Sequence, residues 1–178
     1  MHLRLPLALH RAPVQFVYRR CSGSEFKDIF HFHEGIEFLY IEQGEGQIVT
    51  GSHTFGAGGG TLLFFQPFQL HKLAIRASES KPYVRSFIVY DPDWLNAYLE
   101  PFPRLADFHR RIRKMAWHSQ AVTDLNESSP LSLHIRRMEL LPQAVEDPPS
   151  EEACALFLIH LLELLMPIAA RAAASASP

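Results

Sequence analysis

The sequence predicts a mainly β fold, an antiparallel barrel or sandwich, followed by a helical segment. Two observations carry this prediction. Up to about residue 90, short runs of β-branched and aromatic residues alternate with turns rich in glycine and serine, which is typical of antiparallel barrels and sandwiches. Beyond that point the apolar residues recur at helical spacing. The 178 residues of the chain are enough for one domain with a sizeable core and no disulfide.

Six strands are expected in the first part of the chain, each a short run of β-branched or aromatic residues. The runs are VQFVY (14–18), IEFLYIE (36–42), GQIVT (46–50), TLLFF (61–65), HKLAI (71–75) and VRSFIVY (84–90). The segments between them are expected to form turns, because they are rich in glycine, serine and proline. These segments are CSGS, GEG, TGSH, FGAGGG and ASESKP.

Helix starts can be recognised after residue 90. Asp91 and Ser129 are expected N-caps, and each precedes a proline at the first helical position. The last helix is expected to start at Ser150, since Glu151 and Glu152 then lie in the first turn, where the helix dipole favours acids. In RLADFHRRIRKMAW one apolar face is expected, formed by Leu105, Phe108, Ile112 and Met115.

The last helix is apolar almost all the way round from residue 155 to residue 166, apart from His160 and Glu163. Such a helix must be covered on more than one side. The other helices of the chain could cover it, but the width of the apolar surface favours a homodimer through the C-terminal helices. The run ALFLIHLLELLMPIAA (155–170) is shorter than a membrane span, so no contact with a membrane is expected.

The charge argues against a nucleic-acid-binding chain, and the cysteine content argues against a cysteine-based metal site. The net charge is −2 and the pI is about 6.5, whereas a nucleic-acid-binding chain needs an excess of lysine and arginine. The basic run HRRIRK (109–114) is therefore interpreted as a solvated helix face. Cys21 and Cys154 are far apart and belong to no metal-binding motif, which favours a reduced, cytoplasmic protein.

The stretch HFHEGIEFLYIEQGEG (31–46) carries the clearest chemical signal. Alternate residues of a strand share a face, so His31, His33 and Glu37 are expected to point the same way. Two histidines and a carboxylate are suitable ligands for a divalent transition metal such as Zn, Fe, Mn or Ni. His71, at the start of a later strand, is available as a fourth ligand. The alternative is that these four side chains line a pocket without any metal.

This stretch resembles the first motif of the cupin superfamily, in which HxH is followed by a glutamate and then a glycine. The matching residues are His31, His33, Glu37 and Gly44. GTLLFFQPFQLH (60–71) is similar to the second motif, and its corresponding residues are Gly60, Pro67 and His71. The resemblance implies a jelly-roll-like β-barrel in which the four histidine and glutamate side chains converge.

The chain also departs from the cupin pattern. Glu25 stands where the first motif opens with glycine, and Gly60 lies one residue further from Pro67 than in the family. The turn Pro67-Phe68-Gln69 has no glycine, and one residue fewer separates it from His71. The position of the fourth ligand depends on this shortened turn.

With these departures, the motifs and the helices that follow resemble the N-terminal sensor half of AraC-type transcription regulators. The resemblance implies an N-terminal arm (1–13), a cupin β-barrel (14–90) that binds a small-molecule effector such as a sugar, and a helical dimerisation segment (91–178). DNA would be bound only through a C-terminal half that is not present in this chain. His31, His33, Glu37 and His71 would contact the effector directly or through a metal, and Tyr40, Phe64 and Phe68 are further candidates to line the effector pocket.

Two other functions stay open. A metal-dependent cupin enzyme, such as a dioxygenase or a sugar isomerase, would use the same four ligands to activate oxygen or a substrate. The helical half offers it no obvious acid or base. A stand-alone cupin that binds a small molecule without DNA or catalysis is the third possibility.

Overall fold

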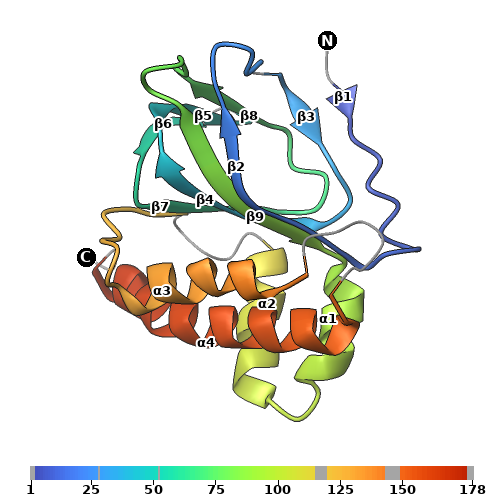
Figure 1. Ribbon diagram of the computed structural model, residues 1–178. Coiled ribbons are helices and arrows are strands. Elements are labelled where there is room, and N and C mark those ends of the chain that lie inside the picture. Colours follow the sequence, from blue (N-terminus) through green and yellow to red (C-terminus); the bar gives the residue numbers. More distant parts are fainter. Residues whose placement is uncertain (1–2, 28, 52, 115–119, 143–148, 176–178) are drawn as a thin grey trace.

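The computed structural model of the protein describes residues 3–27, 29–51, 53–114, 120–142 and 149–175. Two five-stranded sheets face each other above a layer of helices (Figure 1). In spatial order, the first sheet contains β1 (Leu3–Arg4), β3 (His31–Phe32), β8 (His71–Ile75), β5 (Glu45–Thr50) and β6 (His53–Gly58). The second sheet contains β10 (Ala121–Val122), β7 (Thr61–Phe65), β4 (Ile36–Gln43), β9 (Tyr83–Tyr90) and β2 (Val14–Ser22). This confirms the mainly β, jelly-roll-like fold with C-terminal helices.

All six predicted strands are present, and β7 and β8 have the predicted bounds. The prediction of a turn at FGAGGG is wrong, because most of this segment belongs to β6, which pairs with β5 from Glu45↔Gly58 to Thr50↔His53. Glycine disfavours strands, but here the backbone pairing with β5 forms an edge strand. The short strands β1, β3 and β10 have only two residues each, which is too few to give a periodic signal.

Strand β4 is central to the fold because both of its faces are buried. Leu39 and Ile41 face the space between the sheets and pack with residues such as Phe65. Phe38 and Tyr40 face the helices. Odd and even residues therefore have different surroundings, as the alternation of strand side chains predicts.

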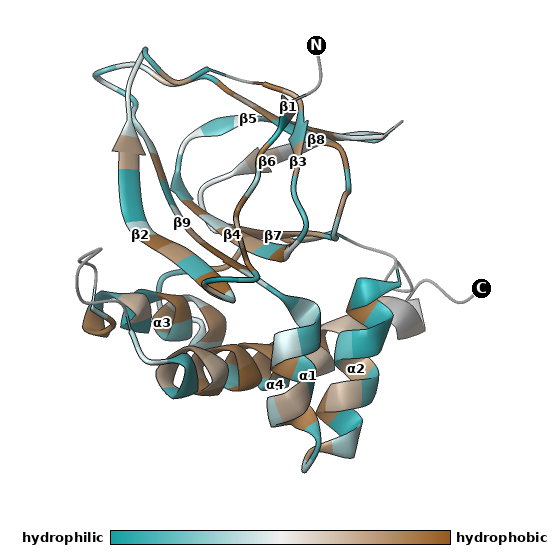
Figure 2. Cartoon of the chain, turned by 90° about the vertical axis from the view of Figure 1, so that its right-hand side faces the viewer, coloured by the Kyte–Doolittle hydropathy of each residue, from teal (hydrophilic) through white to brown (hydrophobic). Residues whose placement is uncertain are grey.

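The helices cover the outer face of the second sheet (Figures 1 and 2). They are α1 (Pro92–Leu99), α2 (Pro103–Arg113), α3 (Pro130–Arg136), the 3-10 helix η1 (Arg137–Leu140) and α4 (Glu151–Ser175). The predicted caps are confirmed: Asp91 accepts from the backbone N–H of Asp93 at 2.8 Å, and Ser129 accepts from that of Ser132 at 3.1 Å. Of the apolar face expected near the second helix, Met115 lies outside the described residues.

Helix α4 is longer than its apolar run suggested. Its stretch Glu151–Ala172 is long and apolar enough, by length and composition alone, to cross a membrane. One face of this stretch is buried in the core with the second sheet and the other helices, through residues such as Leu158, Leu161 and Leu165. The expectation that the apolar run is too short to span a membrane must therefore be corrected. A core helix of a soluble protein can have the same composition, and packing within the chain accounts for the apolar character of the buried face.

The basic run in α2 has local acidic partners. Arg110 and Arg111 form ion pairs with Asp107, and Arg113 forms one with Asp93. All three arginines are exposed. The basic side chains of this run therefore form a solvated helix face, as interpreted, while His109 and Ile112 are fully buried.

Two buried histidines of the helical layer lead to a prediction about acid stability. Burial lowers the pKa of both His109 and His134 from 6.5 to about 4. The unfolded chain therefore binds protons at these sites below pH 6.5, while the folded chain stays neutral until about pH 4. We expect each histidine to remove about 1–2 kcal/mol of unfolding free energy between pH 7.5 and pH 5. Urea unfolding at the two pH values measures this loss, and a His109→Gln/His134→Gln variant should show a flatter dependence. An equally steep dependence in that variant would contradict the assignment.

Candidate functional site

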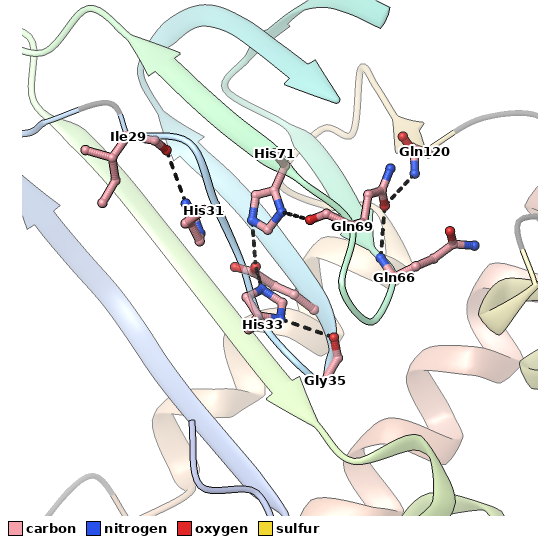
Figure 3. A network of polar contacts seen from close by, with 9 residues as sticks. Ile29, His31, His33, Gly35, Gln66, Gln69, His71 and Gln120 are labelled. Atoms are coloured by element: carbon pink, nitrogen blue, oxygen red, sulfur yellow. Dashed lines mark hydrogen bonds and ion pairs between the residues drawn. The ribbon is translucent and has the colours of Figure 1, made fainter. Parts of the chain in front are cut away.

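Four residues from three neighbouring segments converge between the two sheets. His31 on β3 lies directly opposite His71 on β8, His33 follows β3, and Glu37 projects from β4. Their possible ligand atoms all lie within 4.8 Å of one another. The structure thus brings together all four residues that the sequence singled out (Figure 3).

The local backbone explains how the shortened second motif still places His71 in the cluster. The turn after β7 is closed by a hydrogen bond from the N–H of Gln69 to the carbonyl of Gln66 (3.1 Å). The N–H of Phe68, which has a left-handed backbone (φ +62°), donates to the carbonyl of His33 at 2.7 Å. This bond ties the turn to the first motif, so β8 begins beside β3.

Gly35 allows the chain to bend between His33 and Glu37. A Cβ atom at this position would lie 2.7 Å from the side chains of Leu9 and Val89 and 2.8 Å from the carbonyl oxygen of Tyr90. Only glycine fits such a close approach of backbone and neighbours. The bend keeps the alternation of faces, so His33 and Glu37 meet at 2.9 Å.

The three histidine rings share one hydrogen-bonding pattern. The Nδ1 atom of each lies near a backbone carbonyl two residues away: His31 with Ile29 at 3.2 Å, His33 with Gly35 at 3.2 Å and His71 with Gln69 at 2.9 Å (Figure 3). A carbonyl only accepts, so each Nδ1 must carry the proton. Each ring therefore presents its Nε2 atom to the cluster, which is the arrangement that second-shell partners give to metal-binding histidines.

This orientation creates an electrostatic requirement at Glu37. The Nε2 atoms of His33 and His71 lie 2.9 and 3.5 Å from the same carboxylate oxygen of Glu37. Two nitrogen atoms this close to a carboxylate need a positive charge between them and the oxygen, supplied either by protons on the Nε2 atoms or by a cation. Two ligands held at right angles about 2.1 Å from one metal ion are about 3 Å apart, so the spacing also fits a metal.

The surroundings keep Glu37 ionised. Burial would raise the pKa of its carboxyl, but the hydrogen bond with His33 and the nearby His71 ring outweigh this and hold the pKa well below its usual range. Burial, and secondarily the neighbouring His71, lowers the pKa of His31. An ionised carboxylate and imidazole nitrogens are donor types that Zn, Fe, Mn and Ni accept, and a bound metal would take the place of protons on the Nε2 atoms.

The cluster lies at the wall of a cavity of about 630 Å³ between the sheets. His31, His33 and Glu37 line it together with Leu39 of β4 and Leu73 of β8. Residues 3–13 run along its edge: β1 pairs with β3, and Leu5 and Leu7 line the cavity. The N-terminal segment predicted as an arm thus forms part of the wall.

The aromatic residues predicted to line this cavity lie elsewhere. Tyr40 and Phe64 pack under the helices, and the hydroxyl of Tyr40 shares a 3.1 Å hydrogen bond with Ser132 of α3. Both have even numbers on paired strands, so they occupy the face opposite to Glu37. Phe68 is 61% exposed on the turn after β7 and borders a surface hollow instead.

Sequence reasoning missed the opposite wall of the cavity, which comes from β2 and β9. Its residues include Phe16, Val17, Arg20, Arg85, Phe87 and Val89. Arg85 is the one charge in the mostly apolar run VRSFIVY, and this pattern could have identified it as a buried polar residue. The facing residue Arg20 could not be found, because a register shift between Val17 and Arg20 changes the face of β2.

Residues 13–161 match the model of the AraC-like ligand binding domain. The chain belongs to this family. No curated protein sequence matches it. Among solved structures, ToxT from Vibrio cholerae is 11% identical with a TM-score of 0.48, and the alignment covers 87% of this chain and 55% of ToxT. DMSP lyase DddQ from Ruegeria pomeroyi is 20% identical with a TM-score of 0.29, over 43% of this chain and 36% of the lyase.

This AraC-like domain thus spans about half the length of the ToxT chains it matches. ToxT itself has been solved with an unsaturated fatty acid bound. For the present chain, these distant likenesses concern the fold alone.

Proposed function

We propose that the chain is the effector-sensing domain of an AraC-type transcription regulator. The observation that carries this proposal is the cavity of about 630 Å³ inside an AraC-like ligand binding domain. This size falls within the range of small-molecule sites, which are mostly apolar with a few polar groups. The walls follow that pattern, since apolar residues such as Leu39, Phe87 and Val89 surround the polar cluster.

The N-terminal segment links ligand binding to a conformational response. Leu5 and Leu7 line the cavity, Gln15 donates a side-chain hydrogen bond to the carbonyl of Leu7, and Leu5 donates to the carbonyl of Phe32. A bound effector would touch both the segment and the barrel. It would therefore shift the equilibrium between docked and released forms of residues 3–13, in proportion to its different affinity for the two forms.

We further propose that His31, His33, Glu37 and His71 hold a divalent transition metal beside the effector. The Nδ1 hydrogen bonds that the three rings share and the carboxylate beside their Nε2 atoms support this assignment. A metal there would supply a Lewis acid that an oxygen or nitrogen atom of the effector can bind. These side chains would otherwise contact the effector directly.

The helical layer exposes apolar side chains that could contact a second copy of the chain. Leu133, Leu140 and Leu156 are exposed on the helical layer, and much of α4 is apolar (Figure 2). Exposed apolar surface of this kind marks protein contacts, so we propose a homodimer through the C-terminal helices. DNA would be bound by a separate half of the regulator, and the protein would be soluble and cytoplasmic.

One observation favours a second function. Three histidines and one glutamate leave two positions open on an octahedral metal, as a metal-dependent dioxygenase or sugar isomerase would need. Conversion of a bound compound by the metal-loaded protein would favour the enzyme. Binding without conversion would favour the regulator.

The test of effector binding is a screen of sugars, aromatic acids, fatty acids and short peptides by ligand-observed NMR. We expect at least one class to bind the wild-type chain. A Val17→Trp variant, which fills the cavity, should lose that binding, while Thr54→Trp on the exposed part of β6 should keep it. The proposal fails if no class binds or if Val17→Trp binds as well as the wild type.

A further inference from the structure

Two arginines face each other across adjacent strands at one end of the cavity. Arg20 on β2 is the register partner of Arg85 on β9, and both line the cavity. Like charges directly opposite each other in a sheet are destabilising. Arg20 is exposed and can turn toward water, whereas the whole Arg85 residue is only 9% exposed.

Arg85 has neutral partners among the residues that the structure describes. Its guanidinium donates to the hydroxyl of Ser22 at 3.1 Å and lies over the rings of Tyr83 (4.5 Å) and Phe26 (5.1 Å). No described carboxylate lies within ion-pair distance of it. Glu25 and Glu37 line the same cavity, but neither is paired with Arg85. Burying a charge without a counter-charge in contact is costly, so the guanidinium can accept an anion from outside the chain.

The arginines and the histidine cluster occupy opposite ends of the same cavity. On the shared register of β4 and β9, Glu37 pairs with Val89, and Ile41 pairs with Arg85. Four residues of strand separate the two ends by about 13 Å. The wall between them is apolar, with Leu39 and Phe87 as its central pair.

We propose that the cavity binds a small amphipathic carboxylic acid, with its carboxylate on Arg85 and its apolar body along the wall formed by Leu39, Phe87 and Val17. This inference rests on the proposed effector-binding function and names the class of effector. A guanidinium fork matches a planar carboxylate bidentately. The hydroxyl of Ser22 offers a further donor. The apolar wall then favours an aryl or alkyl chain over a sugar.

The test compares matched acids and amides: 4-phenylbutyrate with 4-phenylbutanamide, and octanoate with octanamide. Isothermal titration calorimetry of the wild-type chain should show at least one acid binding about 10-fold or more tightly than its amide, because only the acid pairs with the buried charge. Arg85→Gln should remove this preference and leave amide binding unchanged. Arg104→Gln, on the exposed surface of α2, should leave both affinities unchanged.

A second measurement needs no ligand. Arg85→Met replaces the buried charge with an apolar side chain of similar length, so the ligand-free variant should melt higher than the wild type, by about 4 °C. A lower melting temperature would make Arg85 a structural residue and overturn the inference. Equal binding of acid and amide, or an unchanged preference in Arg85→Gln, would also overturn it. If only neutral compounds bind, the carboxylate inference falls while effector binding stands; if nothing binds, both fall.

Discussion

Replacing His31 and His33 together by alanine is expected to abolish stoichiometric metal binding, with a loss of Zn²⁺ affinity of at least about 100-fold. The physical reason is the shared donor set. Each of the two rings is oriented by its own Nδ1 hydrogen bond, and His33 also contacts the carboxylate of Glu37 at 2.9 Å. Without them, Glu37 and His71 form a two-ligand site too weak to retain the ion.

The measurement is elemental analysis of protein purified without chelator and without a nickel column, followed by titration with Zn²⁺, Fe²⁺, Mn²⁺ and Ni²⁺. A matched control is His53→Ala on β6, which removes an exposed histidine outside the cluster. Metal should also raise the melting temperature of the wild type and of the control, since an ion that binds only the folded state stabilises it. A wild-type chain that takes up none of the four ions would refute the metal assignment.

Replacing Leu156 by glutamate is expected to dissociate the proposed homodimer, with an increase in the dimer dissociation constant of at least about 100-fold. Leu156 lies on α4 and is 61% exposed in the single chain. In a dimer through this helix it would be buried, and a carboxylate there would lose its hydration without gaining a partner. The folded monomer should be preserved, because the side chain already faces outward.

Analytical ultracentrifugation of the wild type and the variant over a range of concentrations measures this effect. Phe102→Glu provides the control, since Phe102 is also an exposed apolar residue (46%) but precedes α2. If the wild type sediments as a monomer at all concentrations, the dimer is refuted. If Phe102→Glu dissociates it instead, the interface lies on another part of the helical layer.

The four residues of the histidine–glutamate cluster differ in how far the sequence could place them. Spacing alone placed His31, His33 and Glu37 on one face, because the alternation of strand side chains is a local property. The position of His71 depended on the turn after β7, whose hydrogen bond to His33 is a contact between distant segments. The sequence could therefore offer His71 as a ligand without deciding whether it reached the site.

The sequence by itself determined the six strands that it predicted, the helix caps at Asp91 and Ser129, and the chemical character of the first motif. All of these depend on neighbours within a few residues. Only the tertiary structure decided which face of each strand meets the helices. Tyr40 and Phe64, which were predicted to line the pocket, therefore lie in the core. It also brought Arg20 opposite Arg85 across a register shift, because the pairing of distant strands is set by the packing of the whole sheet.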